Sequence, residues 1–599
     1  MINMKHYLKL IISGGLLGVA MTSCLEETFP TDGATSGQLE SADKSAFNAA
    51  IASYMNNMSL YGDGGDASDA GFSSFIIWRD AMTADFAIVN TGYDYFSYYN
   101  QQLYIGNDGI SATFWQRYYY LIQKCNNLLS ISDLDPDGFD ALYVGNALSY
   151  RAMAYMDLAR MFEFKRTGVA YLDEEAANRG IYGLTVPIVT ENTTERESRD
   201  NPRAPFYKMY RFIMDDLNLA EACLSDAHAV SAKTDASIGV VYGLKARLWL
   251  DMGSRFERYV DDLNTMISHE ADEDLNDYDK IGITTANECF ARAAEYARKA
   301  INEGYSPLSE SQWFDPSSGF NTPNNSWLWA NIISTNDIAA TTGEWQSFVS
   351  FQCVEANWGI AVYQDEINYA HGWMIDARLF DKIDEGDWRK TTWIDPEDAG
   401  ASNAFITKYS RGTNLSYNEW RNYRSYVGIK YHPANGERNT STIGNAVSIP
   451  LMRIEEMFLI EAEATAHTSG VGAGKQLLES FMNTYRMSAG ESYTCKAADM
   501  EAFTDELFKQ KRVEFWGEGI VYWDYRRLEL PIERGYPGSN HARQYRFNSY
   551  PEHVAPWTNF YIPDRERDLN KGVILNPDPS QAIPCLLYTS PSPRDRTRS

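Results

Sequence analysis

The chain has 599 residues, and 44% of them are hydrophobic, which is enough to bury a large core and argues against a disordered protein. Its formal net charge of −28 excludes a nucleic-acid-binding function, because a phosphate backbone requires a basic surface. The seven cysteines are widely spaced and form no CxxC pair, so the sequence predicts neither a zinc site nor a disulfide framework. Apolar helical patterns instead predict buried free thiols at Cys125, Cys223 and Cys289.

Residues 1–23 have the pattern of an export signal. Two lysines precede an apolar run that is too short to serve as a permanent membrane anchor. The residues that end this run resemble a lipobox, so we expect cleavage before Cys24 and attachment of a lipid anchor to its side chain. Residues 24–45 are then the lipidated N-terminus and a flexible tether, and residues 46–584 form the folded domain.

Residues 111–303 are predicted to be mostly helical, because apolar residues recur at intervals of three and four. The segments 205–224, 236–252 and 287–303 carry small residues on one face, which lets two helices approach closely. In the last segment this face consists of Ala291, Ala294, Ala297 and Ala300. Such helix pairs cannot bury their apolar faces alone, so the sequence predicts a mainly α fold with stacked, degenerate tetratricopeptide-type repeats. A second helical region is predicted for residues 450–516.

Residues 305–450 interrupt the helical pattern and are rich in Trp, Asn, Gly, Ser and Thr. A long irregular region that is too aromatic for disorder is typical of a ligand-binding surface. Aromatic rings stack on the apolar faces of sugars, and neighbouring polar groups bind the hydroxyls. The candidate ligand-binding rings lie here and in residues 91–102, and they are Tyr93, Tyr95, Tyr98, Trp345, Trp358 and Trp373. For each ring the alternative is packing beneath a loop, and for Trp327 and Trp329 we predict burial in a strand-like run.

No motif in the sequence predicts catalysis. The eight histidines are isolated, and there is no metalloprotease, serine-hydrolase or phosphate-binding glycine motif. Paired carboxylates of a glycoside hydrolase are the remaining catalytic hypothesis, because 81 acidic residues make chance pairs unavoidable. The acidic residues after Arg453 are better explained as ion-pair partners of that arginine and of neighbouring helices. We therefore expect a binding protein that is not an enzyme and has no metal or cofactor, and we leave a structural ion open.

Residues 504–528 predict a helix, then a turn at Gly517 and Gly519, then an aromatic and basic stretch. Thr504 is the expected N-cap of this helix. Its apolar face would leave the charged side chains of Lys509, Lys511 and Glu514 pointing outward.

This segment resembles the C-terminal signature of the SusD/RagB family, the surface glycan-binding lipoproteins of Bacteroidota. The positions that match are Arg512, Glu514, Glu518, Gly519, Asp524 and Arg527. Gln510 stands where the family has Glu and Val521 where it has Arg, so a charge pair of the family is expected to be absent here. A second, upstream helix motif of the family matches at Pro450, Arg453, Glu456, Leu459, Ala462, Glu463 and Ala464.

The resemblance implies a SusD-like fold with a loop-rich, aromatic ligand-binding face. It also implies capture of an oligosaccharide or polysaccharide at the cell surface and delivery to a SusC-like TonB-dependent transporter. The two acids after Cys24 resemble the signal that places such lipoproteins on the outer face of the outer membrane. The alternatives are a tetratricopeptide-type scaffold that binds a peptide or protein, or a glycoside hydrolase. Residues 585–599 resemble a translated sequencing adaptor, so we expect a non-native tail.

Overall fold

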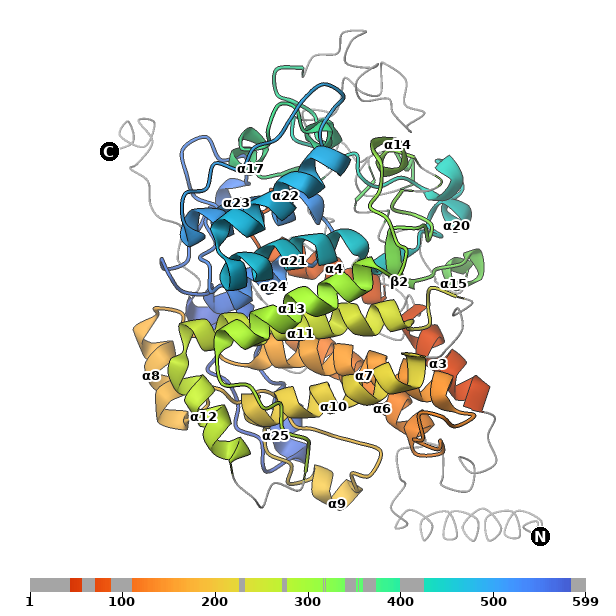
Figure 1. Ribbon diagram of the computed structural model, residues 1–599, viewed down its shortest axis with the longest axis vertical. Coiled ribbons are helices and arrows are strands. Elements are labelled where there is room, and N and C mark those ends of the chain that lie inside the picture. Colours follow the sequence, from red (N-terminus) through yellow and green to blue (C-terminus); the bar gives the residue numbers. More distant parts are fainter. Residues whose placement is uncertain are drawn as a thin grey trace, which may run out of the picture.

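Helices make up most of the regular structure in the computed structural model, and a few short strands accompany them (Figure 1). The described residues are 44–56, 71–87, 110–225, 232–271, 277–315, 317, 319–339, 349, 352–353, 355–358, 373–398 and 425–582. The predicted mainly α fold is therefore confirmed. None of the helices in these ranges is both long enough and apolar enough to cross a membrane.

A row of long helices forms the centre of the fold, and each helix packs against the next. In packing order they are α6 (Ile110–Leu129), α7 (Ala141–Phe162), α10 (Phe206–Ser225), α11 (Ile238–Arg258), α13 (Ala286–Ile301), α21 (Ile454–Ser469) and α22 (Val471–Tyr485). The contact between α13 and α21 joins the two predicted helical regions into one row, as Figure 1 shows. Consecutive helices thus stack in pairs, and the resemblance of the pairs to tetratricopeptide repeats stays a prediction.

The helices of this row approach closely where their side chains are small. A Cβ atom on Gly253 of α11 would lie 2.9 Å from the ring of Phe290 on α13, so only glycine permits this contact. On α13 the buried alanines are Ala293, Ala297 and Ala300, whereas Ala291 is exposed. The predicted alanine face is therefore only partly right, because a spacing of three residues drifts around a helix with 3.6 residues per turn. The predicted buried free thiols are confirmed for Cys125, Cys223 and Cys289.

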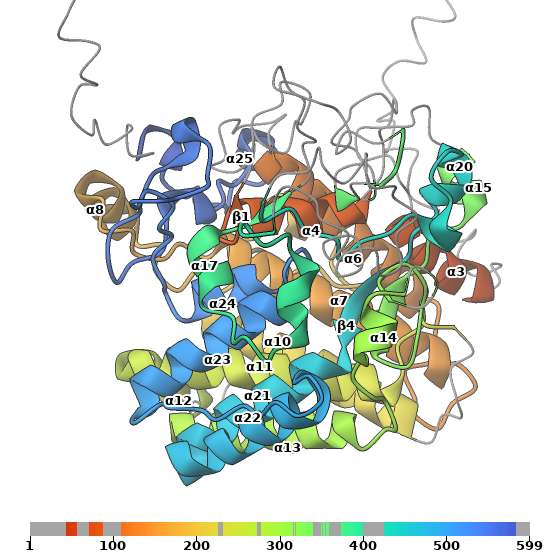
Figure 2. The same cartoon turned by 90° about the horizontal axis from the view of Figure 1, so that it is seen from above.

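Shorter helices surround the row. They are α3 (Lys44–Asn56), α4 (Phe72–Ala81), α8 (Ala170–Arg179), α9 (Glu195–Ser198), α12 (Val260–Glu270), α14 (Glu310–Trp313), α15 (Thr335–Ala339), α17 (Ala377–Asp381), α20 (Ser441–Gly444), α23 (Met500–Glu514), α24 (Val521–Arg527) and α25 (Asp564–Leu569). Figure 2 shows β1, α4 and α17 on one side of the molecule and α13, α21 and α22 on the other. The described part of residues 305–450 contains only short elements, which agrees with the predicted loss of helical pattern.

Two small antiparallel sheets link distant parts of the chain. Strands β1 (Phe86–Ala87) and β3 (Met374–Ile375) form one, and β2 (Trp327–Asn331) and β4 (Ile449–Arg453) form the other. The indoles of Trp327 and Trp329 in β2 are fully buried, so the predicted burial in a strand is confirmed. Strand β4 leads directly into α21, and this places Arg453 at the junction of the sheet and the helix row.

The signature segment folds as two helices joined by a glycine turn. Helix α23 begins earlier than predicted, because the side chain of Asp499 accepts a hydrogen bond from the amide of Ala502 and caps it. Thr504 is not the N-cap and lies inside the helix, where its hydroxyl donates to the carbonyl of Met500. The helix ends at Glu514, and Gly517 and Gly519 lie in the turn that follows, with left-handed φ values of 81° and 68°. The aromatic and basic stretch that follows folds as helix α24, which buries the rings of Tyr522 and Tyr525 and pairs Arg527 with Asp524.

Candidate functional site

Most of the predicted ligand-binding rings lie outside the described residues. These are Tyr93, Tyr95, Tyr98 and Trp345, and the predicted lipidation site Cys24 also lies outside the described ranges. Trp358 and Trp373 are described, and both are buried, with 7% and 4% of their surface exposed. The described structure therefore locates the base from which the predicted loops start.

The sheet of β1 and β3 brings the two predicted aromatic regions to one place. Phe86 pairs with Ile375 and Ala87 pairs with Met374 in antiparallel register. The tyrosine-rich segment follows directly after Ala87, and Trp373 directly precedes Met374. Both predicted ligand-binding segments therefore join the fold at the same end of this sheet, which we call the ligand-face root (residues 83–87 and 373–376).

An aromatic cluster packs under the ligand-face root. The ring of Trp373 contacts Phe86 edge to face with 4.6 Å between centroids, and Phe86 contacts Trp516 at 4.7 Å. Trp516 in turn contacts Trp393 at 5.6 Å. Edge-to-face pairs of this kind add stability beyond the burial of their area. Trp373 thus belongs to the packed base, and little of its ring is open to a ligand.

Trp358 lies in a separate small core with Val349, Cys353, Ala356, Ala434 and Val447. A Cβ atom on Gly444 would lie 2.8 Å from its ring, so the indole is covered by the backbone of α20. The adjacent Asn357 is exposed, and its amide donates a 2.7 Å hydrogen bond to the side chain of Asn439. The indole of Trp358 is therefore packed inside the protein, which is the alternative that we gave for each ring.

The signature helices hold the ligand-face root through Asp85. Arg512 of α23 donates from Nε to the carboxylate of Asp85 at 2.6 Å, and Tyr525 of α24 donates to the same oxygen at 3.2 Å. The indole N–H of Trp516 donates to the backbone carbonyl of Asp85 at 3.1 Å. Arg534 adds two hydrogen bonds to the carbonyl of Thr83, at 2.8 and 2.6 Å. A residue next to the predicted loops is thus fixed by side chains from the C-terminal part of the chain.

Glu514 is the centre of a buried group of ions behind this root. Its carboxylate forms ion pairs with Arg389 at 2.8 Å, Arg453 at 3.1 Å and Arg486 at 2.7 Å, and all four side chains are fully buried. Burial alone would raise the pKa of Glu514, but the three guanidinium groups hold it well below its usual range. The carboxylate therefore stays ionised inside the core, because three permanent cations surround it.

The same group extends to Glu518 and Lys430. Arg453 donates to both carboxylate oxygens of Glu518 at 2.8 Å, and Lys430 pairs with that carboxylate at 2.6 Å. Burial lowers the pKa of Lys430 to about 8, although Glu518 opposes the shift. Arg453 also pairs with Glu455 at 2.9 Å, which confirms the predicted pairing of this arginine with the acids that follow it. We call these residues the charge corner: Arg389, Lys430, Arg453, Glu455, Arg486, Glu514 and Glu518.

The expected outward direction of the charged side chains on α23 is wrong for two residues. Glu514 lies in the charge corner, and Lys511 is buried between Glu463 at 2.9 Å and Asp524 at 3.1 Å. The prediction failed because helical periodicity separates apolar from polar residues and cannot detect polar residues whose partners lie elsewhere in the chain. Lys509 is only partly buried and pairs with Asp384 near the surface.

Gln510, one of the two departures from the family pattern, contributes to the charge corner as a neutral side chain. Its carbonyl oxygen accepts a 2.5 Å hydrogen bond from Arg389, and its amide donates to Glu506 at 3.0 Å. Arg389 also pairs with Asp387 at 2.6 Å, so its charge is already balanced by two carboxylates. Gln510 thus contributes two hydrogen bonds to this region and no charge.

The residues in the described ranges include no group of three or more histidine, cysteine or acidic side chains arranged to hold a metal ion. The carboxylates of α21 serve as ion-pair partners of neighbouring helices, as predicted. Glu456 accepts from Arg247 of α11 at 2.7 Å, and Glu461 accepts from Arg298 of α13 at 2.7 Å. These acids join the helices of the row.

Two family models match the chain. Residues 382–583 match the model of the SusD family, and residues 39–250 match a model described as "Starch-binding associating with outer membrane". Together the two matches span more than half of the chain. The first includes the signature helices and every residue of the charge corner, and the second includes α6, α7 and α10 of the row. No curated protein matches the chain.

Several solved structures share the fold. A SusD-like carbohydrate-binding protein from Bacteroides vulgatus is 18% identical with a TM-score of 0.62, and the match covers 92% of this chain and 99% of that one. A SusD superfamily protein from Bacteroides thetaiotaomicron is 17% identical with a TM-score of 0.57, covering 90% and 99%. Surface glycan-binding protein A from the same organism, solved with laminarihexaose, is 14% identical with a TM-score of 0.57, covering 89% and 98%. At these identities the comparison shows a shared fold.

Proposed function

Because this chain belongs to the SusD family, we propose that it binds a glycan at the outer membrane and delivers it to a SusC-like TonB-dependent transporter. The observation that carries the proposal is the pair of family matches, one of which is described as starch-binding. A protein of the same fold, surface glycan-binding protein A, was solved in complex with laminarihexaose. The proposed role requires no bond cleavage, since capture alone raises the local concentration of the glycan at the transporter.

We place the binding surface on the loops that start at the ligand-face root. Tyr93, Tyr95, Tyr98 and Trp345 are the rings that would stack on sugar faces. The root supports this assignment because Arg512, Tyr525 and Arg534 fix the place where these segments join the fold. Trp358 and Trp373 are the weaker members of the predicted set, because little of either ring is exposed.

The experiment that tests glycan binding is affinity electrophoresis of the chain without residues 1–24 and 585–599. Gels would contain plant, host or microbial polysaccharides, and a gel without polysaccharide gives the reference mobility. We expect retardation by one glycan class, and loss of that retardation in Tyr95→Ala or Trp345→Ala. The matched control is Tyr171→Ala, which removes an exposed ring from α8. Retardation by no glycan, or equal losses in the control, would contradict the proposal.

We propose further that the mature chain is anchored by a lipid on Cys24 and faces the cell exterior. Metabolic labelling with palmitate tests the anchor. We expect label in the wild-type chain and none in Cys24→Ala, while Cys125→Ala, which removes a buried thiol, keeps the label. Label that persists in Cys24→Ala would contradict the anchor, and protection of the protein from added protease in intact cells would contradict the outward orientation.

A further inference from the structure

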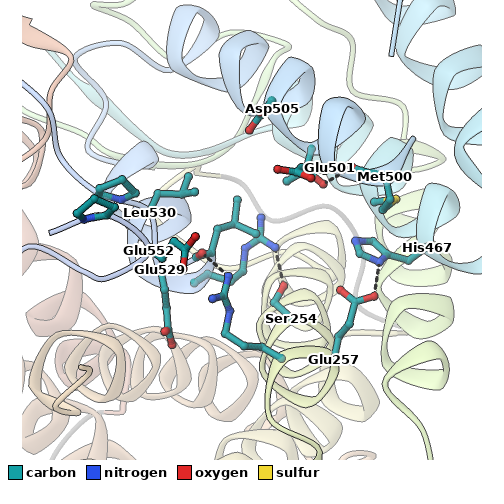
Figure 3. Close-up of a pocket in the computed structure, with 15 residues that line it drawn as sticks. Ser254, Glu257, His467, Met500, Glu501, Asp505, Glu529, Leu530 and Glu552 are labelled. Atoms are coloured by element: carbon teal, nitrogen blue, oxygen red, sulfur yellow. Dashed lines mark hydrogen bonds and ion pairs between the residues drawn. The ribbon is translucent and has the colours of Figure 1, made fainter. Parts of the chain in front are cut away.

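A cleft with a volume of about 610 Å³ lies away from the ligand-face root (Figure 3). It opens between the C-terminal ends of α11 and α21, the N-terminal end of α23 and the segment that follows α24. None of its lining residues belongs to the ligand-face root or to the charge corner. A cleft of this size is within the range that binds ligands of several hundred daltons.

We call the half-buried apolar residues that line the cleft its floor, and the exposed carboxylates that line it its rim. Met500, Leu530 and Pro531 are among the apolar residues that line it. The carboxylates of the rim are exposed, and they belong to Glu257, Glu501, Asp505 and Glu552. Figure 3 shows Glu501 and Asp505 on one side of the cleft and Glu257 on the opposite side. A ligand in the cleft would therefore meet carboxylates from two directions.

The cations near the cleft are already engaged by other groups. Arg527 pairs with Glu463 at 2.7 Å and with Asp524 at 2.6 Å, and it donates to the hydroxyl of Ser254 at 2.6 Å. Arg258 donates to the carbonyl of Leu528 at 2.7 Å. In contrast, Glu501 and Asp505 form no ion pair with any residue that the structure describes. The carbonyl of Leu528 is neutral, so the charge of Arg258 is not balanced by it, but four exposed carboxylates against this one cation leave the net charge at the cleft negative.

The wall of the cleft is built on a tightly held backbone. Glu529 and Glu552 have φ values of 52° and 59°, in the left-handed region that non-glycine residues seldom occupy. The side chain of Glu529 is fixed by Lys165 at 3.1 Å and by the hydroxyl of Tyr259 at 2.7 Å. Such conformations persist only where the surrounding contacts determine them, so the contacts of Glu529 hold this part of the cleft wall in place.

The residues that line the cleft favour one class of ligand and disfavour others. Apart from the imidazole of His467, no aromatic ring is present among the described lining residues, so the cleft offers a sugar no stacking surface. The acidic rim repels anions. Lysine and arginine side chains combine an apolar stem, which packs on an apolar floor, with a cationic end, which pairs with a carboxylate. We propose that this cleft binds a lysine- or arginine-containing segment of a polypeptide partner, independently of glycan binding.

The probe for this proposal is a fluorescein-labelled peptide of alternating lysine and leucine, titrated into the soluble chain and followed by fluorescence anisotropy. The test variant is Glu501→Gln with Asp505→Asn, which removes two rim charges. The matched control is Glu174→Gln with Glu303→Gln, which removes two exposed charges outside the cleft and gives the same net charge. Thermal unfolding of each variant checks that it is folded. A second peptide, with serine in place of leucine, tests the apolar floor.

We expect the rim variant to bind the lysine–leucine peptide about tenfold more weakly than wild type, with the control within about twofold. Wild-type affinity should fall as salt rises, because the rim carboxylates are exposed to solvent. The serine peptide should bind more weakly than the leucine peptide. Equal losses in the rim variant and the control would overturn the proposal, since they would mean that the overall negative charge attracts the peptide. Absence of binding at low salt would also overturn it.

Discussion

The charge corner and the cleft use the same residue types in opposite ways. In the charge corner, Glu514 is fully buried, and three guanidinium groups pair with it. At the cleft, Glu501 and Asp505 lie only a few turns away on the same helix, yet both are exposed and form no ion pair within the described residues. One helix thus carries a structural carboxylate at its C-terminal end and available carboxylates at its N-terminal end. The difference lies in burial and pairing, not in the residue type.

The largest expected effect comes from breaking the charge corner. Glu514→Gln keeps the size of the side chain but removes the anion that three buried arginines share. Removing one partner of a buried ion pair costs about 3–5 kcal/mol, because the remaining charges stay desolvated. We expect a loss of this size in the free energy of unfolding, measured by urea denaturation. A loss below about 1 kcal/mol would mean that the corner is hydrated and that its ions contribute little.

A smaller effect is expected where the signature helices hold the ligand-face root. Arg512→Met keeps the stem of the side chain and removes the ion pair with Asp85. A hydrogen bond to a charged group contributes about 1.5–3 kcal/mol, so unfolding should become easier by about 2 kcal/mol. Amide exchange of the root should also accelerate. Arg292→Met, which removes an exposed arginine of α13, is the control and should change neither quantity.

The pH dependence of the free energy of unfolding should reflect the ion pairs of the buried carboxylate of Glu463. Burial alone would raise the pKa of Glu463, but Arg527 and Lys511 lower it to about 2. Because the folded pKa lies below the unfolded value of about 4.3, the native state gains stability above that value and loses it as the pH falls towards 2. We expect the urea concentration at the midpoint of unfolding to decrease below about pH 4. In Glu463→Gln this decrease should be smaller. An identical pH profile in this variant would contradict the assigned pairing.

The smallest effect is expected at the cleft. Glu501→Gln removes an exposed carboxylate in the first turn of α23, where the helix dipole favours an anion only slightly. The free energy of unfolding should change by less than about 0.5 kcal/mol. A clear decrease in the free energy of unfolding would mean that Glu501 stabilises the fold as Glu514 does. It would contradict the proposed difference between the two carboxylates.

The sequence predicted the elements of the fold better than the environment of its charges. Periodic apolar residues locate α13 and α21 within a few positions, because each helix carries its own pattern. The burial of Glu514 could not be predicted, because its partners Arg389 and Arg453 lie 125 and 61 residues away. Only the match to the family signature distinguished Glu514 from the other acidic residues of the sequence. A local pattern cannot distinguish an exposed charge from one that is paired across the fold.

The candidate sites show the same limit. The indole of Trp358 has the chemistry of a sugar platform, but the close approach of Gly444 covers it, and residues so distant in sequence give no local signal. The cleft could not be predicted at all, because α11, α21, α23 and two later segments each contribute a few residues to it. Residue type can therefore identify aromatic rings that could bind a sugar. Whether a ligand can reach a ring depends on the exposure of that ring in the fold.

The most direct test of the account is a crystal structure of the soluble chain with the oligosaccharide that retards it in affinity electrophoresis. The account predicts sugar rings stacked on at least one of Tyr93, Tyr95, Tyr98 or Trp345, next to the sheet of β1 and β3, and no sugar in the acidic cleft. Sugar bound on the floor formed by Met500 and Leu530, with the loop rings unoccupied, would contradict both the placement of the ligand face and the ligand class assigned to the cleft.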